Sequence, residues 1–280
     1  MEDFSAFIPK VIFEQIPIKN LVSNQEYQRN LSAYHIKRTA NDFNLYQINP
    51  VKVSRRDGIN FVFNGQHTIE IVALVSESRD TPVWCMVYDE LEYKAEADIF
   101  ANQQKYNRPL SAYEIFKANV ESGSDDELLI KDLVESYGMT ISSAKKVGAI
   151  CAISTLCLIF RNFGYQTLDR TLRLCIGAWE GDVNSFTANI LKGIAQLVVT
   201  FEDDLRDDLF IDKVGGLSLR DLVRTAGERK GKFAYAETML MAYNKQMKQP
   251  LPQKALYGIN KKIRKKPYEI VVATETKEAV

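Results

Sequence analysis

"FVFNGQHTI", residues 61–69 of this 280-residue chain, has the pattern of a strand that leads directly into a helix. The apolar run stops at Asn64-Gly65, and an apolar helical pattern begins at His67, one of only two histidines in the chain. Glycine at such a junction lets a ligand approach the backbone closely, and the first amides of a new helix favour an anion such as phosphate. The junction is therefore the first candidate site. A plain tight turn is the alternative, which an Asn-Gly pair supports equally well.

The segments on either side of this junction predict an α+β unit over residues 1–110. Asp57-Gly58 is typical of a type I′ hairpin turn, because glycine tolerates the positive φ that this turn requires. Ser32 is suited to cap a helix whose apolar positions recur at helical spacing. We expect strands at 11–18, 51–56, 59–63 and 81–90, and helices at 32–43 and 67–75.

From Tyr93 onward the apolar spacing is helical, which predicts an all-helical domain over residues 111–270 and a flexible tail at 271–280. Ser124 and Glu127 are spaced as a capping box, and Gly138 is placed to end that helix. A second short helix over 142–150 would complete a helix-turn-helix near 127–148. Further helices are expected at 167–179, 185–200, 203–213, 218–226 and 232–247.

The charge of the chain is balanced overall and uneven locally. Thirty-six basic and thirty-six acidic residues cancel, so no global field attracts DNA or an anionic membrane. Residues 240–266 hold eight Lys or Arg and no acid, whereas residues 202–212 hold six acids. These two segments are expected either to contact each other or to bind different partners.

Cysteine usage and hydropathy predict a cytoplasmic protein. The four cysteines, Cys85, Cys151, Cys157 and Cys175, lie in apolar sequence without a CxxC pair, so we expect buried, reduced thiols. Acidic residues near the N-terminus are unlike a signal peptide. The longest apolar run, 147–160, is too short to cross a bilayer and is expected to be one core segment, which excludes membrane insertion.

Three segments of the sequence follow one another in the order of the three boxes of a known superfamily. Residues 16–43 resemble the first box, in which a strand, a polar loop and a Gln-Arg pair precede a helix. Residues 48–74 resemble the second, where a hairpin leads into a turn such as Asp-Gly-Gln-His-Arg. Residues 97–118 resemble the third, an Asn-Gln-rich helix end before a Leu-Ser helix start. Together they resemble the ParB/sulfiredoxin superfamily, and in particular its phage-type ParB-like proteins, which implies a mixed-sheet α+β domain followed by helices.

The same resemblance implies a nucleotide site for CTP or ATP with Mg²⁺. This chain lacks the second-box arginines of the partition proteins, and Gln66 stands where sulfiredoxin has its cysteine, which excludes sulfiredoxin activity. Arg55 and Arg56 are further sources of positive charge, although arginines beside a hairpin turn are usually solvated. The residues expected to bind nucleotide are Gln28, Arg29, Gly65, Gln66, His67, Thr68, Asn102 and Arg108. Gln28-Arg29 is equally suited to anchor its loop.

Two residues are candidates for catalysis. The resemblance to a free-serine kinase implies that Glu26 acts as a general base, and His67 is suited to move a proton near neutral pH. A nuclease, NTPase or phosphotransferase is therefore one functional alternative, although no acidic metal-binding motif accompanies it. His35, in the first turn of its helix, is expected to be solvated.

DNA is the expected partner. Phosphate contacts are expected from the helix-turn-helix and from the basic segment, whose alternative role is a solvated tail. The candidate DNA-binding residues are Ser142, Lys145, Lys146, Lys261, Lys262, Arg264, Lys265 and Lys266. The favoured function is a phage or mobile-element protein that acts on or near DNA and is regulated by nucleotide. A catalytically inert adaptor that binds another protein is the alternative, and a homodimer is the candidate assembly.

Overall fold

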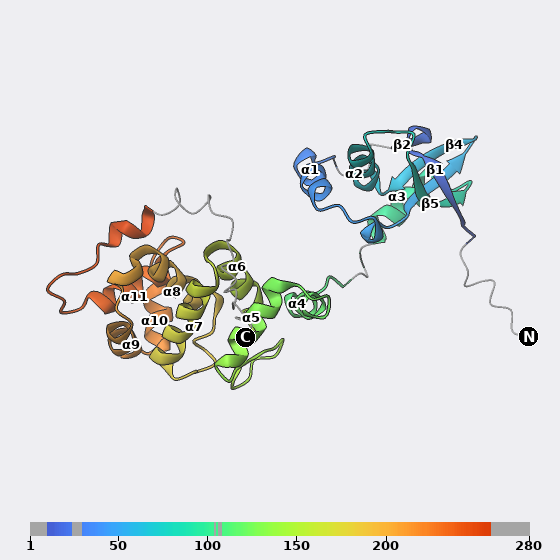
Figure 1. The fold of residues 1–280 in the computed structure, drawn as a ribbon. Coiled ribbons are helices and arrows are strands. Elements are labelled where there is room, and N and C mark those ends of the chain that lie inside the picture. The colour runs from blue at the N-terminus through green and yellow to red at the C-terminus, as the bar shows by residue number, and fades with distance from the viewer. Residues whose placement is uncertain (1–9, 24–29, 104, 106–107, 259–280) are drawn as a thin grey trace, which may run out of the picture. The chain divides into compact units, whose positions relative to one another are not determined.

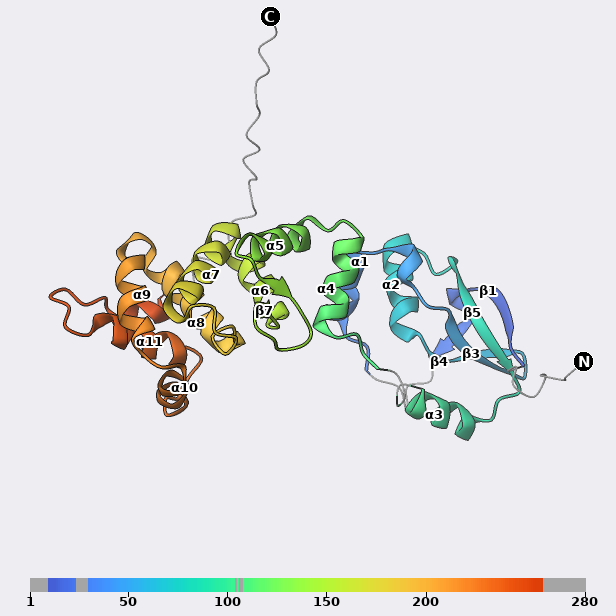
Figure 2. The same cartoon turned by 90° about the horizontal axis from the view of Figure 1, so that it is seen from below.

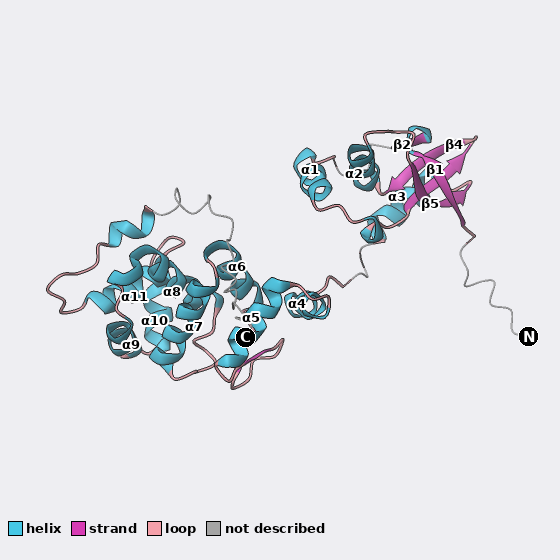
Figure 3. Cartoon of the chain, in the orientation of Figure 1, coloured by secondary structure: helices cyan, strands magenta, loops and turns pink. Residues whose placement is uncertain are grey.

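The structure is a computed structural model that describes residues 10–23, 30–103, 105 and 108–258. The chain divides into two compact units, with the boundary between Pro109 and Leu110. The larger sheet belongs to the first unit, and the second is helical apart from two short strands (Figures 1 and 3). This architecture confirms the expected fold class, a mixed-sheet α+β domain followed by a helical domain. The second unit is not purely helical, however, and the expected tail at 271–280 lies outside the described residues.

The first unit is built on a five-stranded mixed sheet with the order β1-β5-β3-β4-β2. β1 is antiparallel to β5 and β3 is antiparallel to β4, whereas β3 runs parallel to β5 and β2 parallel to β4. The sequence did not predict β2. The strands are β1 (Ile12–Pro17), β2 (Leu21–Ser23), β3 (Val51–Arg56), β4 (Ile59–Asn64) and β5 (Pro82–Asp89), and the helices are α1 (Ala33–Asn41), α2 (Gln66–Ser76) and α3 (Tyr93–Asn102).

The hairpin between β3 and β4 has the predicted turn. Asp57 has φ +49° and Gly58 has φ +75°, the two positive values that a type I′ turn requires. One face of the sheet packs against α2. Because side chains alternate between the two faces along each strand, the strand residues buried on this face recur at every second position. This core contains Val51, Val53, Val62, Val83, Cys85 and Val87 from the sheet and Ile69 and Val72 from α2. The hairpin thereby delivers the chain to the start of α2 from the middle of the sheet.

α3 contacts the other face of the sheet, apart from α1 and α2 (Figure 2). Glu96 on α3 is fully buried and pairs with Arg56 of β3 at 3.0 Å. The Arg56 guanidinium also lies 4.6 Å from the centre of the Phe61 ring. A buried carboxylate requires a positively charged partner, so Arg56 has a structural role in holding α3 on this face of the sheet.

The second unit packs its helices around α7, α8 and α11. Side chains from these three helices form one buried cluster, in which Tyr243 and Ile194 are fully buried. Among the described helices, none combines the length and apolar composition that a membrane span requires. The helices are α4 (Ala112–Glu121), α5 (Asp125–Ser136), α6 (Ile153–Phe163), α7 (Tyr165–Trp179), α8 (Ala188–Phe201), α9 (Asp207–Gly215), α10 (Leu219–Gly227) and α11 (Ala234–Asn244).

The expected helix-turn-helix near 127–148 is wrong, because its second helix is absent. α5 ends as predicted before Gly138, which has φ +68°, but the chain then forms β6 (Thr140–Ile141), a loop and β7 (Ala149–Ile150). The two short strands are parallel. The Ser142 hydroxyl accepts from the Ala144 amide at 3.1 Å, a local bond that competes with helix formation. Gly148, at φ +72°, provides a second bend that a helix does not allow.

α5 also begins differently from the expected capping box. The Ser124 hydroxyl donates to the Glu127 carboxylate instead of accepting from a backbone amide. Glu127 is 2% exposed and also accepts from Asn119 at 3.3 Å and from Arg161 at 2.6 Å. Burial alone would raise the pKa of Glu127, but these hydrogen bonds and the Arg161 charge outweigh it and lower the pKa. Glu127 on α5 therefore links this helix to α4 through Asn119 and to α6 through Arg161.

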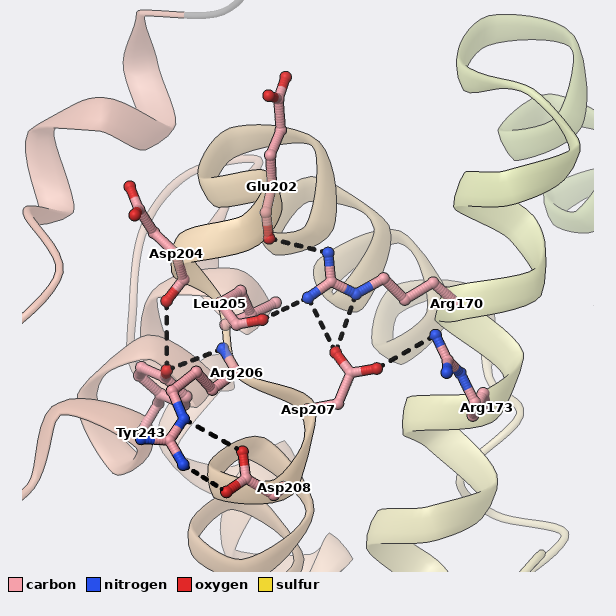
Figure 4. Close-up of polar contacts among 9 residues, drawn as sticks. All are labelled: Arg170, Arg173, Glu202, Asp204, Leu205, Arg206, Asp207, Asp208 and Tyr243. Carbon is pink, nitrogen blue, oxygen red and sulfur yellow. Dashed lines mark hydrogen bonds and ion pairs between the residues drawn. The ribbon is translucent and has the colours of Figure 1, made fainter.

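The acidic stretch begins with a 3-10 turn (Glu202–Asp204), and α9 starts only at Asp207, later than expected. Arg170 on α7 donates to the Asp207 carboxylate at 2.8 Å, to the Glu202 carbonyl at 2.8 Å and to the Leu205 carbonyl (Figure 4). Arg173 pairs with the other oxygen of Asp207 at 3.1 Å. Part of the acidic stretch is thus bound to α7 within this unit.

The cysteines are free thiols, but they are not all buried as expected. Cys85 and Cys175 are buried, and burial raises their pKa to about 11 and about 12. Cys157 is partly buried and Cys151 is exposed. The run 147–160 is not one core segment, because it is divided between a loop end, β7 and α6, and Val147 is 90% exposed.

Candidate functional site

A cleft of about 720 Å³ opens at the predicted strand-to-helix junction. Three parts of the first unit form it: the entry to α1, the turn from β4 into α2, and the end of α3. The described residues that line it are Asn30, Ser32, His35, Asn64, Gly65, Gln66, His67, Thr68, Phe100, Ala101 and Gln103. The cleft therefore gathers segments that are about seventy positions apart in sequence.

Gly65 is the N-cap residue of α2 and forms the turn between β4 and this helix. Its φ of +107° lies in the left-handed region, which residues with a Cβ rarely adopt. A Cβ at this position would lie 3.2 Å from the Cα of Val51 on the neighbouring strand. Glycine is thus required twice, for the turn and for the close approach to β3. Since glycine has no side chain, this N-cap residue cannot itself accept from the first amides of the helix.

The two histidines of the chain lie side by side in this cleft. The ring centroids of His35 and His67 are 5.4 Å apart, with the rings inclined at 74°. The Ser32 amide donates to Nε2 of His67 at 3.3 Å, and the Ser32 hydroxyl accepts from the His35 amide at 3.3 Å. Because Nε2 accepts a hydrogen bond, the neutral ring of His67 carries its proton on Nδ1. The N-cap residue of α1 therefore fixes the orientation of a side chain on α2.

The third wall comes from the end of α3. The Asn64 side-chain amide donates to the Gln103 side-chain carbonyl at 2.9 Å, which ties the end of β4 to the residue after α3. Phe100 contributes a partly buried aromatic ring. Asn102, by contrast, is not a lining residue. Its side-chain amide donates to the backbone carbonyl and to the carboxylate of Asp98, at 3.1 and 2.8 Å.

No Lys, Arg, Asp or Glu occurs among the described residues that line the cleft. The arginines expected to supply charge from the hairpin have other partners: Arg55 pairs with Glu14, and Arg56 with Glu96. Within the described part of the chain, no three His, Cys, Asp or Glu side chains are placed to hold a metal ion. With neutral histidines, the cleft therefore carries no net charge from these residues.

The structure brings together only some of the residues expected at the site. Gly65, Gln66, His67 and Thr68 line the cleft, whereas Asn102 and the exposed Arg108 are not among its lining residues. Glu26, Gln28 and Arg29 lie outside the described residues. His35 was expected to be solvated. It is exposed, but it also lines the cleft. Its position three residues after Ser32, the N-cap of α1, was the signal in the sequence that could have pointed to a site role. Its contact with His67, however, is seen only in the packing of α1 on α2.

The candidate DNA-binding residues belong to the second unit. Ser142, Lys145 and Lys146 lie in the loop between β6 and β7, and both lysines are exposed. Lys145 Nζ donates to Asn184 Oδ1 at 2.7 Å. The basic candidates Lys261, Lys262, Arg264, Lys265 and Lys266 lie outside the described residues.

Solved structures similar to this chain include two of the C-terminally truncated chromosome-partitioning protein ParB from Caulobacter crescentus. One, complexed with CTP-gamma-S, has 12% identity and a TM-score of 0.35, and the match covers 81% of this chain and 98% of that chain. The other, complexed to the centromeric parS site, has 17% identity and a TM-score of 0.27, with coverages of 80% and 98%. Sequence identities and TM-scores this low give no ground for assigning the ligands of those proteins to this chain.

Sequence comparisons place the chain in a family. No curated protein matches it. A family model matches residues 22–255, which include the whole cleft and most of the helical unit. The expected phage-type subgroup stays a prediction. Because the match spans most of the 280 residues, the chain belongs to the family of unknown function DUF6551.

Proposed function

We propose that the first unit binds a nucleotide in the cleft and that the chain acts on or near DNA. The observation that carries the nucleotide proposal is a cleft of about 720 Å³ that opens at the first turn of α2. Sites for small molecules usually measure about 300–1,000 Å³. The amides at the start of a helix favour the phosphate of such a ligand.

The other lining residues match the remaining parts of a nucleotide. Amide side chains such as Asn30 and Gln103 offer donors and acceptors to the edge of a base, and Phe100 offers an aromatic face. CTP and ATP are the proposed ligands, with Mg²⁺ bound through their phosphates. Magnesium often keeps several waters and takes few protein ligands, so a dedicated cluster of carboxylates is not required.

The test is the response of the full chain to CTP, ATP, GTP and ADP with Mg²⁺. A ligand present at about one hundred times its Kd stabilises the native state by about 2.7 kcal/mol, so its melting temperature should rise by several degrees. Thr68→Val removes a hydroxyl from the cleft and should weaken binding about tenfold, as expected for one lost hydrogen bond. Calorimetric titration gives both affinities.

Thr39→Val is the matched control, since Thr39 lies within α1 and is not among the residues that line the cleft. It should bind as the parent does. If none of the four nucleotides changes the melting temperature or releases heat, the nucleotide proposal is wrong and the adaptor alternative gains support.

The DNA proposal is supported by the loop between β6 and β7. Lys145 and Lys146 are adjacent and exposed, and no acidic residue occurs from Ile141 to Ala149. Contacts from such lysines to phosphates would bind DNA without sequence recognition. The affinity of the chain for a labelled duplex, measured by fluorescence anisotropy, should therefore fall steeply as salt rises.

Replacing both Lys145 and Lys146 with alanine should reduce the slope of log Kd against log salt by about two, roughly one for each lost phosphate contact. Lys131→Ala is the control, because Lys131 on α5 already pairs with Glu135 at 3.2 Å. No binding by the parent at low salt, or an unchanged slope in the double variant, would remove this loop from the proposal.

A further inference from the structure

The charge of the cleft depends on its two histidines. His35 and His67 both line it, with ring centroids 5.4 Å apart, and they are the only two in the chain. The other described lining residues have no titratable side chain. Histidine is the side chain whose charge ordinarily changes between pH 5 and 8. Among the described residues that line the cleft, only the two imidazoles can present a positive charge to an anionic ligand.

Several charged side chains of α1, α2 and α3 line another groove or are already paired. On α1, Lys37 lines a separate groove together with Glu70 and Arg79. Glu70 of α2 is paired with Arg79 at 3.0 Å, and Asp98 of α3 accepts from Asn102. Arg38, three positions after His35, and Lys105, two positions after the lining residue Gln103, are further described cations in neighbouring segments, and neither is a lining residue.

The two imidazoles are not equivalent. Nε2 of His67 accepts from the Ser32 amide, and protonation of that nitrogen would remove this hydrogen bond. His35 contacts Ser32 through its backbone amide, so protonation of the His35 ring leaves that bond intact. Two imidazolium rings at this separation would also repel each other. One proton on His35 and a neutral His67 is the arrangement that this geometry favours.

We propose that a phosphate-bearing ligand binds in this cleft together with a proton, which His35 takes up and presents to the phosphate, while His67 keeps its hydrogen bond from the Ser32 amide. The proton comes from solvent, and no covalent bond forms or breaks. This inference rests on the proposed nucleotide site and adds two things to it: His35 as a binding residue, and regulation of affinity by pH. Binding should strengthen as the pH falls, since uptake of one proton changes affinity by up to tenfold per pH unit.

The test is calorimetric titration of the full chain with CTP and, separately, ATP at pH 6, 7 and 8, at constant ionic strength. Two buffers of different ionisation enthalpy give the number of protons taken up. The nucleotide phosphates titrate in this range themselves, so the quantity that decides is the difference between the parent and His35→Gln. His35→Gln should take up fewer protons and bind about tenfold more weakly at pH 6, with the two affinities converging at pH 8.

Two further variants separate binding from proton uptake. Lys37→Gln removes a fixed cation from the same helix but from the other groove, and its proton uptake should equal that of the parent. His67→Gln retains an acceptor for the Ser32 amide, so its proton uptake and the pH dependence of its binding should equal those of the parent. If the parent and His35→Gln bind with the same proton uptake and the same pH dependence, the proton-coupled role is overturned while the nucleotide site stands. If neither nucleotide binds at any pH, both fail.

Discussion

Gly65→Ala should lower the free energy of unfolding of the first unit by about 3 kcal/mol. Two penalties add. The left-handed φ of +107° is strained for alanine, and the new Cβ would lie 3.2–3.3 Å from Cα, Cγ1 and Cγ2 of Val51. Val51 is fully buried in β3, between β4 and β5, so neither its backbone nor its side chain can move away without disturbing the sheet.

Gly58→Ala isolates the first penalty. Gly58 also has a positive φ, +75°, but a Cβ added there would have no atom within 4 Å, so a loss of only about 1 kcal/mol is expected. Urea unfolding should be followed by Trp84 fluorescence in a Trp179→Phe background, because Trp84 and Trp179 are the only tryptophans and each belongs to one unit. The midpoint should fall with an unchanged m-value. Equal losses in the two alanine variants would show that the contact with Val51 contributes nothing.

Arg170→Met should destabilise the second unit by about 3 kcal/mol. The Arg170 side chain is 19% exposed and donates to Asp207 and to the carbonyls of Glu202 and Leu205 (Figure 4). Methionine has a similar length and apolar stem, but it cannot donate. The substitution leaves a partly buried carboxylate and two carbonyls without this donor, and such losses cost more than the original contacts contribute.

Arg173→Met is the matched control for this change. Arg173 lies on the same helix and contacts the same carboxylate at 3.1 Å, but its side chain is 53% exposed. Its loss should cost less than about 1 kcal/mol, as exposed ion pairs usually do. Trp179, whose ring N–H donates to the Leu217 carbonyl at 3.1 Å, reports unfolding of this unit in a Trp84→Phe background. Similar losses from both variants would mean that the charge of Asp207 matters and the carbonyl contacts do not.

The junction at Gly65 links stability to the proposed function. The same missing Cβ that lets α2 start against β3 leaves the N-cap without a side chain, and the cleft opens at that point. Loss of ligand binding in Gly65→Ala would therefore not distinguish a blocked site from an unfolded one. Thr68→Val and His35→Gln are better tests of binding, since neither position requires a left-handed backbone.

Features that depend on a few consecutive residues could be predicted from the sequence. The Asp57-Gly58 turn, the N-cap at Ser32 and the left-handed Gly138 are all present as predicted. Each is set by the φ preference of one residue or by a hydrogen bond across three positions, so no other part of the chain is needed. The strand-to-helix change at Gly65 belongs to the same class, and it made the cleft residues Gly65–Thr68 predictable.

Which of these segments contact one another depends on long-range packing and is seen only in the folded chain. The pairing of β2 with β4, the binding of Arg55 and Arg56 by Glu14 and Glu96, and the contact between His35 and His67 all join residues more than thirty positions apart. Local patterns contain no information on such partners, because each depends on how α1, α3 and the edge strands pack on the sheet. The failed helix 142–150 has the same cause: its apolar residues fit a helical pattern, but Ser142 and Gly148 shape a loop that β6 and β7 close.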